Sequence, residues 1–137
     1  MKKQYRILIA DDDFVSLKAA QKILEKRGYN TSTARSGKEV LDRIADDQFD
    51  LILMDIKMPG MNGMDATKQI RGKKSELKNI PIVAMTAYAM YGDKERLLQA
   101  GIDDYIAKPL EKEDLIEVVE RNVKELVQLP DNQGLAI

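Results

Sequence analysis

Five short strand-like segments, four of them apolar, alternate with longer amphipathic stretches along this chain of 137 residues, and the alternation limits the folds open to it. The short segments predict strands, and the stretches with apolar residues at helical spacing predict helices. Strict alternation of this kind is typical of one α/β domain with a parallel sheet and helices on both faces. The expected strands are Ile7–Ala10, Tyr29–Ala34, Leu51–Met54, Ile82–Met85 and Tyr105–Ala107.

The composition of the expected strands indicates their order in the sheet. The strands at 7–10, 51–54 and 82–85 are almost wholly apolar, as strands buried on both faces are. The polar strand at 29–34 and the short strand at 105–107 suit the two edges. These constraints predict the order 2-1-3-4-5, which is the doubly wound arrangement of flavodoxin-like folds.

The last expected helix sets the limit of the domain. Its apolar stripe continues to about Val127, and Pro130 is expected to end it. We therefore expect one domain over residues 1–127, and a flexible tail or the start of a linker over residues 128–137. The polar stretch Gly72–Asn79 is expected to be a loop. The expected helices are Phe14–Arg27, a helix from Ser36 onward, Met64–Arg71, Asp93–Ala100 and Lys112–Val127.

Composition excludes several kinds of site. The chain has no cysteine and no histidine, which rules out disulfides, zinc sites built from these residues and histidine-dependent triads. A net charge of -1 with 5% aromatic residues does not indicate a nucleic-acid surface. No apolar run approaches the roughly 18–20 residues of a membrane span, and no signal-peptide core is present. We expect a cytoplasmic protein that by itself binds neither nucleic acid nor membrane.

Reactive side chains directly follow four of the expected strands. Ligands of doubly wound sheets bind beyond the carboxyl ends of the strands. The first and third strands are neighbours in the expected order, so their aspartates should share one crevice. The residues in these positions are Asp11, Asp12 and Asp13 after the first strand, Asp55 after the third, Thr86 after the fourth and Lys108 after the fifth.

Such a gathering of carboxylates needs a counter-charge. Two unit charges about 4 Å apart repel by roughly 4 kcal/mol at an effective dielectric of 20. Lys108 offsets one charge, and the rest require protonation or a cation. Oxygen ligands suit Mg²⁺ better than zinc, and Mg²⁺ so held completes its shell with phosphate oxygens. The predicted chemistry is phosphoryl handling.

Asp55 is the best candidate for the nucleophile. An ionised carboxylate can attack phosphorus without a general base and form an aspartyl phosphate. Thr86 would need a base to attack, so its hydroxyl better suits a hydrogen bond to a phosphoryl oxygen. Lys108 suits an ion pair with another phosphoryl oxygen.

Four segments of the chain resemble the receiver domain of two-component response regulators. The resemblance covers about residues 4–127, and its most specific part is the pattern Asp-x-x-Met-Pro-x-Met-x-Gly that begins at Asp55. The stretches Ala84–Met90 and Ala100–Tyr105 look most like receivers attached to hybrid sensor histidine kinases. The matching segments are Ile7–Asp12, Leu51–Gly63, Met85–Ala87 and Lys108–Pro109.

The resemblance implies a role for each site residue. Asp55 would be the phosphoacceptor, and Thr86 and Lys108 would contact the phosphoryl group. Asp11 and Asp12 would organise Mg²⁺ together with Asp55. The backbone carbonyl of Lys57 would be a further ligand of that ion.

The resemblance also implies a switch and two kinds of partner. Tyr105 would turn inward when Thr86 moves toward the phosphate, and the Lys108–Pro109 bond would be cis. The face built from the helix at 93–100, the strand at 105–107 and the last helix would then change its affinity for a downstream protein. The phosphodonor would be a histidine kinase or a phosphotransfer protein.

Each of these residues has another interpretation when taken alone. Asp12 or Asp13 could serve only to cap the first helix, and we assign Asp13 to that role. Asp55 could be a turn residue, Thr86 a capping hydroxyl and Lys108 a solvated surface lysine.

Two other functions are open to the whole chain. One is an interaction module that is never phosphorylated. The other is a Mg²⁺-dependent phosphatase with an aspartyl nucleophile, but the pattern Asp-x-Asp-x-Thr of that class needs an acid where this chain has Lys57. No stretch is left for a DNA-binding output domain, so we expect either a standalone receiver that works through protein contacts or a receiver excised from a longer sensor kinase.

Overall fold

The fold is taken from a computed structural model, which describes residues 4–73, 76–87 and 93–135. Strands and helices alternate along the described residues, as the sequence predicts. The strands are β1 Arg6–Ala10, β2 Asn30–Ala34, β3 Leu51–Asp55, β4 Ile82–Thr86 and β5 Asp104–Ala107. The helices are α1 Phe14–Lys26, α2 Gly37–Asp46, α3 Gly63–Arg71, the short 3₁₀ helix η1 Glu76–Asn79, α4 Asp93–Ala100 and α5 Lys112–Leu135.

The strands form one parallel sheet in the order β2-β1-β3-β4-β5, which confirms the predicted order. Every residue of β3 and β4 is buried, because helices cover both faces of these central strands. The edge strand β2 is mostly half-buried, in keeping with its polar sequence.

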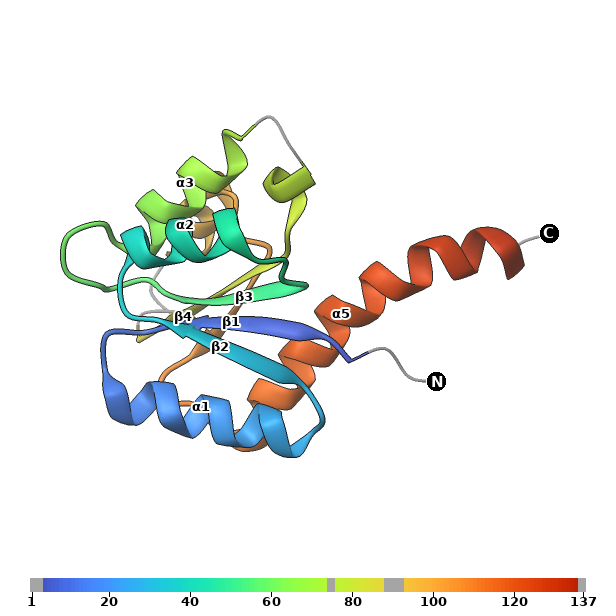
Figure 1. Cartoon of the computed structure of the whole chain (residues 1–137), viewed down its shortest axis with the longest axis horizontal. Helices are drawn as coiled ribbons and strands as arrows, with labels where there is room; N and C mark the ends of the chain where they lie inside the picture. Colours follow the sequence, from blue (N-terminus) through green and yellow to red (C-terminus); the bar gives the residue numbers. More distant parts are fainter. Residues whose placement is uncertain (1–3, 74–75, 88–92, 136–137) are drawn as a thin grey trace.

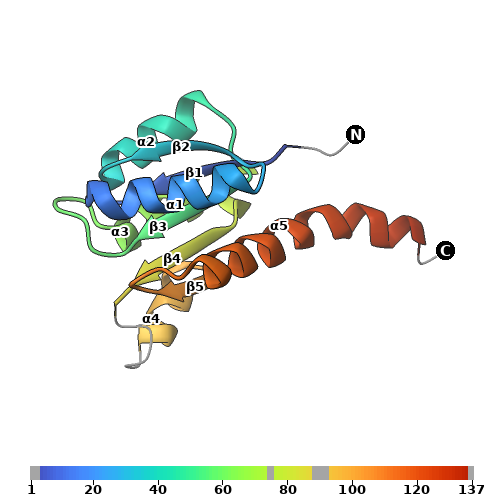
Figure 2. The same cartoon turned by 90° about the horizontal axis from the view of Figure 1, so that it is seen from below.

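The helices form one layer on each face of the sheet (Figure 1). Seen from below, α1 and α5 lie side by side in front of the strands (Figure 2). Side chains alternate between the two faces along each strand. Ile7 and Ile9 of β1 pack with α1 and α5, whereas Leu8 and Ala10 pack in the cluster that α2, α3 and α4 cover.

The last helix is longer than predicted. The sequence indicates an end at Pro130, but α5 runs to Leu135 and extends beyond the amino-terminal edge of the sheet (Figure 1). Proline within a helix removes one hydrogen bond of the ladder, but its fixed φ near −65° lies within the helical range, so a helix can contain it at a cost in stability. The predicted end of the helix at Pro130 is therefore wrong, and residues 136–137 lie outside the described residues. The assignment of residues 128–137 to a tail or the start of a linker stays a prediction. The domain boundary at residue 127 stays a prediction.

A second correction concerns the polar stretch 72–79. Its last part forms η1 rather than open loop. Three-residue periodicity of this kind is common in short connections, and it leaves too little apolar patterning to be seen in the sequence. Among the described residues, no helix combines the length and the apolar character needed to cross a membrane.

Candidate functional site

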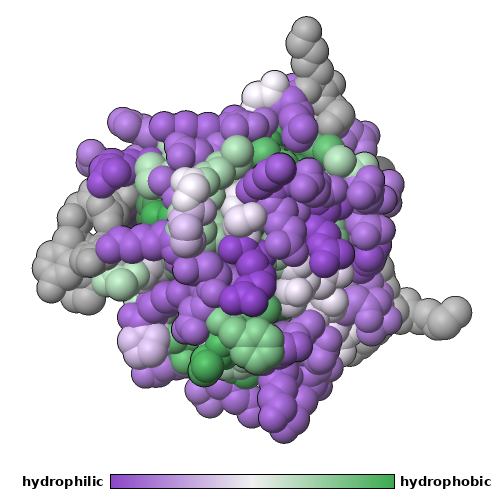
Figure 3. Space-filling model, turned by 60° about the vertical axis from the view of Figure 1, so that its left-hand side comes forward, coloured by the Kyte–Doolittle hydropathy of each residue, from purple (hydrophilic) through white to green (hydrophobic). Residues whose placement is uncertain are grey.

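The predicted site residues meet at the carboxyl-terminal edge of the sheet. Asp11 follows β1, Asp55 and Thr86 end β3 and β4, and Lys108 follows β5. Asp11, Asp55 and Thr86 are polar residues that are nonetheless buried, with 1%, 5% and 5% exposure. Figure 3 looks onto this edge, whose surface is mostly hydrophilic with a small apolar patch.

Three carboxylates form a compact acidic cluster here. Oxygens of Asp11, Asp12 and Asp55 all lie within 4.8 Å of one another. Asp13 is not part of the cluster, because its carboxylate accepts from the backbone N–H of Val15 and the hydroxyl of Ser16. This geometry confirms its assignment as the cap of α1. An oxygen-only donor set of this size fits Mg²⁺.

Lys108 joins the two buried carboxylates of the cluster. Its ammonium Nζ lies 3.0 Å from Oδ2 of Asp11 and 3.2 Å from Oδ2 of Asp55. Its backbone N–H donates to the carbonyl of Thr86 at 2.9 Å, which fixes the end of β5 beside the end of β4. The Lys108–Pro109 peptide bond is cis, as the resemblance implies.

The ionisation of this group of charges is strongly perturbed. The pKa of Asp55 is raised from 3.8 to about 6, first by burial and then by the hydrogen bond and charge of Asp11, against the lowering effect of Lys108. Burial lowers the pKa of the Lys108 ammonium, but its contacts with Asp11 and Asp55 outweigh burial, so the net change is upward. Lysine therefore stays charged at neutral pH, while the carboxyl of Asp55 titrates near pH 6.

The loop between β3 and α3 wraps closely around Asp55. The backbone N–H of Lys57 donates to Oδ1 of Asp55 at 3.1 Å. Gly63 donates to the carbonyl of Ile56 at 3.1 Å, and a Cβ at Gly63 would collide with the carbonyl oxygen of Asp55. Glycine is thus needed at this position for the loop to close. The role of the Lys57 carbonyl as a metal ligand stays a prediction.

Thr86 and Tyr105 lie on the same face of the sheet, on the neighbouring strands β4 and β5. Thr86 contributes to the wall of a groove of about 600 Å³ that Lys57, Met58 and Leu97 also line. Tyr105 is half-buried on the neighbouring strand, paired with Ala84 in register, and packs against the core cluster covered by α2, α3 and α4. The acidic cluster, Thr86 and Lys108 are therefore brought together, whereas Tyr105 lies apart from them.

Sequence reasoning missed three residues beside the site. Arg35 follows β2 and donates from Nη2 to the backbone carbonyl of Asp12 at 3.0 Å. Phe14 and Val15 begin α1 and are 54% and 74% exposed, which is unusual for large apolar side chains. Arg35 directly follows β2, and Phe14 and Val15 begin the helix that follows β1. These positions were the available signal, since the segments that follow the strands of this sheet border the same edge.

Asp12→Asn is expected to weaken Mg²⁺ binding by at least about tenfold, the lower end of what is lost when even an outer partner of a metal ligand is removed. The same change should raise the free energy of unfolding without metal by about 1 kcal/mol, because it relieves repulsion within a partly exposed cluster. Isothermal titration with Mg²⁺ and urea unfolding in EDTA measure the two effects. Asp13→Asn is the matched control, since it removes one neighbouring charge outside the cluster and keeps a good cap. Equal losses of affinity in both variants would contradict the assignment.

Comparison with known proteins agrees with this geometry. The sequence model of the response regulator receiver domain family matches residues 7–120. The receiver domain of a sensor histidine kinase from Pseudomonas aeruginosa has a similar fold, with a TM-score of 0.81 and 32% identity over 89% of this chain and 99% of that one. That structure has a magnesium ion coordinated in its active-site cleft.

Two curated relatives show the settings in which such a domain occurs. Hybrid signal transduction histidine kinase I of Dictyostelium discoideum is 38% identical over 129 residues, which make up 90% of this chain and 7% of that protein. Polar-differentiation response regulator DivK of Brucella ovis is 40% identical over 113 residues, or 82% of this chain and 91% of DivK. The chain thus spans nearly all of a single-domain regulator and a small part of the hybrid kinase. It belongs to the response regulator receiver domains of two-component signal transduction.

Proposed function

We propose that this receiver accepts a phosphoryl group on Asp55 from the phosphohistidine of a histidine kinase or phosphotransfer protein, in a Mg²⁺-dependent reaction. The observation that carries the proposal is the joint burial of Asp55 and Asp11 around one ammonium group, with Asp12 at the rim. Neither a helix cap nor a turn residue needs such a cluster. The domain is a phosphoacceptor signalling module rather than a classical enzyme.

In the transfer, a carboxylate oxygen of Asp55 attacks the phosphorus atom. The O–P bond forms as the N–P bond to the donor imidazole breaks. The donor ring carries a proton on its other nitrogen, so it takes the electron pair of the N–P bond and leaves as neutral imidazole. A carboxyl group with a pKa of about 6 is mostly ionised at neutral pH, so no general base is required.

Fixed charges and hydrogen-bond donors surround the reacting carboxylate. The ammonium of Lys108 lies 3.2 Å from Oδ2 of Asp55 and can pair with a phosphoryl oxygen. The Thr86 hydroxyl at the end of β4 can donate to another. Mg²⁺, held by Asp11, Asp12, Asp55 and the carbonyl of Lys57, would supply positive charge opposite the remaining oxygens.

The proposed output is a change in the face formed by α4, β5 and α5. Thr86 ends the strand that lies beside Tyr105, and the half-buried ring of Tyr105 lies against the core that α4 covers. A hydroxyl drawn toward the new phosphate would leave space for this ring to move inward, and a downstream protein would bind the altered face. The downstream partner and the cytoplasmic location remain predictions.

Intact-mass spectrometry after incubation with acetyl phosphate tests the proposal. We expect one added phosphoryl group in Mg²⁺ and none in EDTA. Beryllofluoride, which resembles an acyl phosphate when bound to a carboxylate, should bind under the same conditions. Failure of both the phosphoryl adduct and beryllofluoride binding in Mg²⁺ would favour the interaction module that is never phosphorylated.

A further inference from the structure

Arg71 connects several segments at the amino-terminal edge of the sheet, opposite the phosphoacceptor site. It is the last residue of α3, and its side chain is only 21% exposed. The guanidinium is a planar fork of donors, which suits several acceptors at once. It donates from Nε to the carbonyl of Gly101 at 2.8 Å, from Nη1 to the carbonyls of Lys78 at 2.8 Å and Ile80 at 2.6 Å, and from Nη2 to Oδ2 of Asp103 at 2.7 Å.

The turn that ends α4 is shaped around this side chain. Gly101 has a φ of +101°, and the N–H groups of Gly101 and Ile102 donate to Leu98 and Leu97 in the manner of a helix C-cap. A Cβ at Gly101 would lie 2.6 Å from Cγ of Arg71. The stem of Arg71 therefore packs directly on the backbone of the cap, while its head binds the carbonyl of the same residue.

Asp103 ties this anchor to the strand that carries Thr86. Its Oδ2 accepts from Arg71 and also from the backbone N–H of Ile82, the first residue of β4, at 2.8 Å. The start of β4 and the end of α4 are thus held to one guanidinium through charge-assisted bonds.

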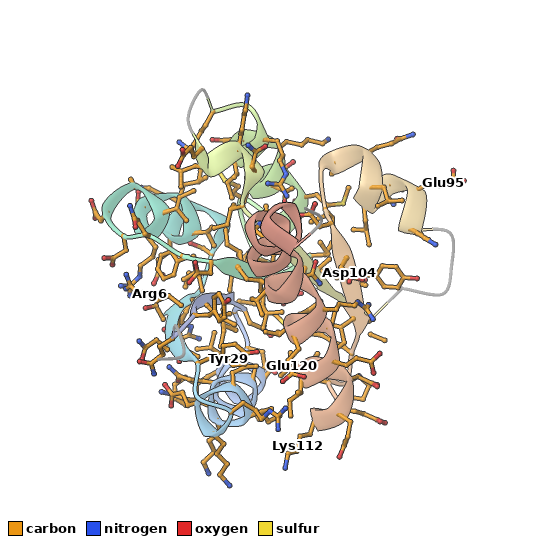
Figure 4. The ribbon with its side chains drawn as sticks, turned by 90° about the vertical axis from the view of Figure 1, so that its right-hand side faces the viewer. Arg6, Tyr29, Glu95, Asp104, Lys112 and Glu120 are labelled. Carbon is orange, nitrogen blue, oxygen red and sulfur yellow. The ribbon has the colours of Figure 1, made fainter. Side chains whose placement is uncertain are left out.

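The two ends of α4 are held differently. Leu97 and Ala100 in its C-terminal half are buried and Leu98 and Gln99 there are exposed, whereas residues 94–96 near its start are all exposed. Figure 4 views the molecule from the amino-terminal edge, and Glu95 points away from the body of the domain there. The start of α4 is also the end that follows Thr86 along the chain.

We propose that Arg71 is a positioning residue for the switch, which anchors the C-terminal end of α4 so that a displacement at its start becomes a rotation of the helix. A helix held at one end pivots, whereas a helix loose at both ends absorbs the displacement. The rotation of α4 rests on the proposed function, since the switch begins with phosphorylation of Asp55. The anchoring itself exists without phosphorylation and can be measured separately.

Hydrogen exchange of the Arg71→Lys variant tests the anchor. Lysine keeps the charge beside Asp103 but cannot reach three carbonyls with one ammonium group. We expect amides of α4 to exchange roughly tenfold faster without metal, because bonds from a charged donor stabilise a local segment more than neutral ones do. Amides of β1 and β3 should stay within about twofold of wild type, since these strands report the global stability. Phosphoryl uptake at Asp55 should persist, but beryllofluoride should no longer change the exchange of α4.

Two further variants keep the test decisive. Arg27→Lys is the control, because it removes another guanidinium, which lies 2.7 Å from the carboxylate of Glu120 on the other face of the sheet. It should leave the exchange rates of the α4 amides unchanged. Asp103→Asn is the substitute variant if Arg71→Lys does not fold. It keeps an acceptor for the N–H of Ile82 but loses the charge beside Arg71, so it should increase the exchange rate of α4 by a smaller factor. Two results would overturn the proposal. One is an equal increase in amide exchange rate in α4, β1 and β3 of Arg71→Lys. The other is a change of α4 exchange on binding beryllofluoride that is as large in Arg71→Lys as in wild type. A wild-type chain that takes up neither phosphoryl nor beryllofluoride would refute the proposed function instead, and the metal-free comparison would still decide the anchor.

Discussion

Asp55→Asn is expected to abolish phosphoryl uptake and, at the same time, to stabilise the metal-free domain above pH 6. The amide is not a nucleophile toward phosphorus, so the covalent adduct should be lost completely. Asparagine is also uncharged, so it removes the cost of burying the Asp55 carboxylate and, in addition, the repulsion between Asp55 and Asp11. A residue retained for function at the expense of stability should behave in this way.

The pH dependence follows from the raised pKa of Asp55. A carboxyl whose pKa is about 6 in the folded chain and 3.8 in the unfolded chain favours folding below pH 3.8 and loses that contribution as the pH rises through 6. A pKa difference of one between the folded and unfolded chains corresponds to about 1.4 kcal/mol, so ionisation of Asp55 costs at most about 3 kcal/mol. Water at the open side of the site screens part of this cost. The free energy of unfolding of Asp55→Asn should therefore exceed that of wild type by up to that amount at pH 8 and by little at pH 4.

Urea unfolding in EDTA at several pH values measures this gain. Asp46→Asn is a suitable control, because Asp46 is exposed at the end of α2, away from the cluster. The control should change the free energy of unfolding by less than about 0.5 kcal/mol at every pH. A gain in Asp55→Asn that is the same at pH 4 and pH 8 would contradict the assigned ionisation.

Lys108→Met is expected to destabilise the metal-free domain by about 2–3 kcal/mol at pH 8, because it leaves two buried carboxylates without their cation. The pKa of Lys108 is raised in the folded chain, so titration of the lysine itself removes its contribution only above 10.5, as the pH rises through the folded pKa. Between pH 5 and pH 8 the lysine stays charged, and the pH dependence comes from Asp55. The loss should shrink to about 1 kcal/mol at pH 5, where Asp55 is largely protonated in both proteins.

Addition of Mg²⁺ should reduce the difference in free energy of unfolding between Lys108→Met and wild type, since a cation at the cluster replaces part of the missing charge. Lys112→Met serves as the control, because Lys112 is an exposed lysine at the start of α5. A loss of stability in Lys108→Met that is independent of both pH and Mg²⁺ would show that the lysine contributes only packing.

The positions of the site residues could be predicted because they depend on strand order. The apolar strands around Leu8, Leu53 and Val83 had to be central, and that order alone brings Asp11 and Asp55 to the same edge. The burial of Asp11 and Asp55 and the bridging role of Lys108 depend on contacts between distant parts of the chain. Lys108 lies 97 positions after Asp11 and 53 positions after Asp55. Residue type and spacing therefore predict the edge of the sheet on which these residues lie. They do not predict how deeply the residues are buried or which side chains they contact.

Arg71 shows why other features could not be predicted. Its acceptors are mostly backbone carbonyls, which every residue carries, so nothing in the sequence distinguishes the ones that it binds. The extension of α5 past Pro130 was missed for a different reason, since proline usually ends helices and local propensity is only a weak prior.

The most direct test of the account is to locate the phosphoryl group by borohydride reduction. Borohydride converts an aspartyl phosphate to the alcohol of homoserine and releases phosphate, and peptide mass spectrometry then identifies the reduced residue. After incubation with acetyl phosphate and Mg²⁺, we predict homoserine at position 55 alone, and none when Mg²⁺ is replaced by EDTA. Reduction at Asp11, Asp12 or Asp13, or equal reduction in EDTA, would contradict the assignment of Asp55 as the phosphoacceptor.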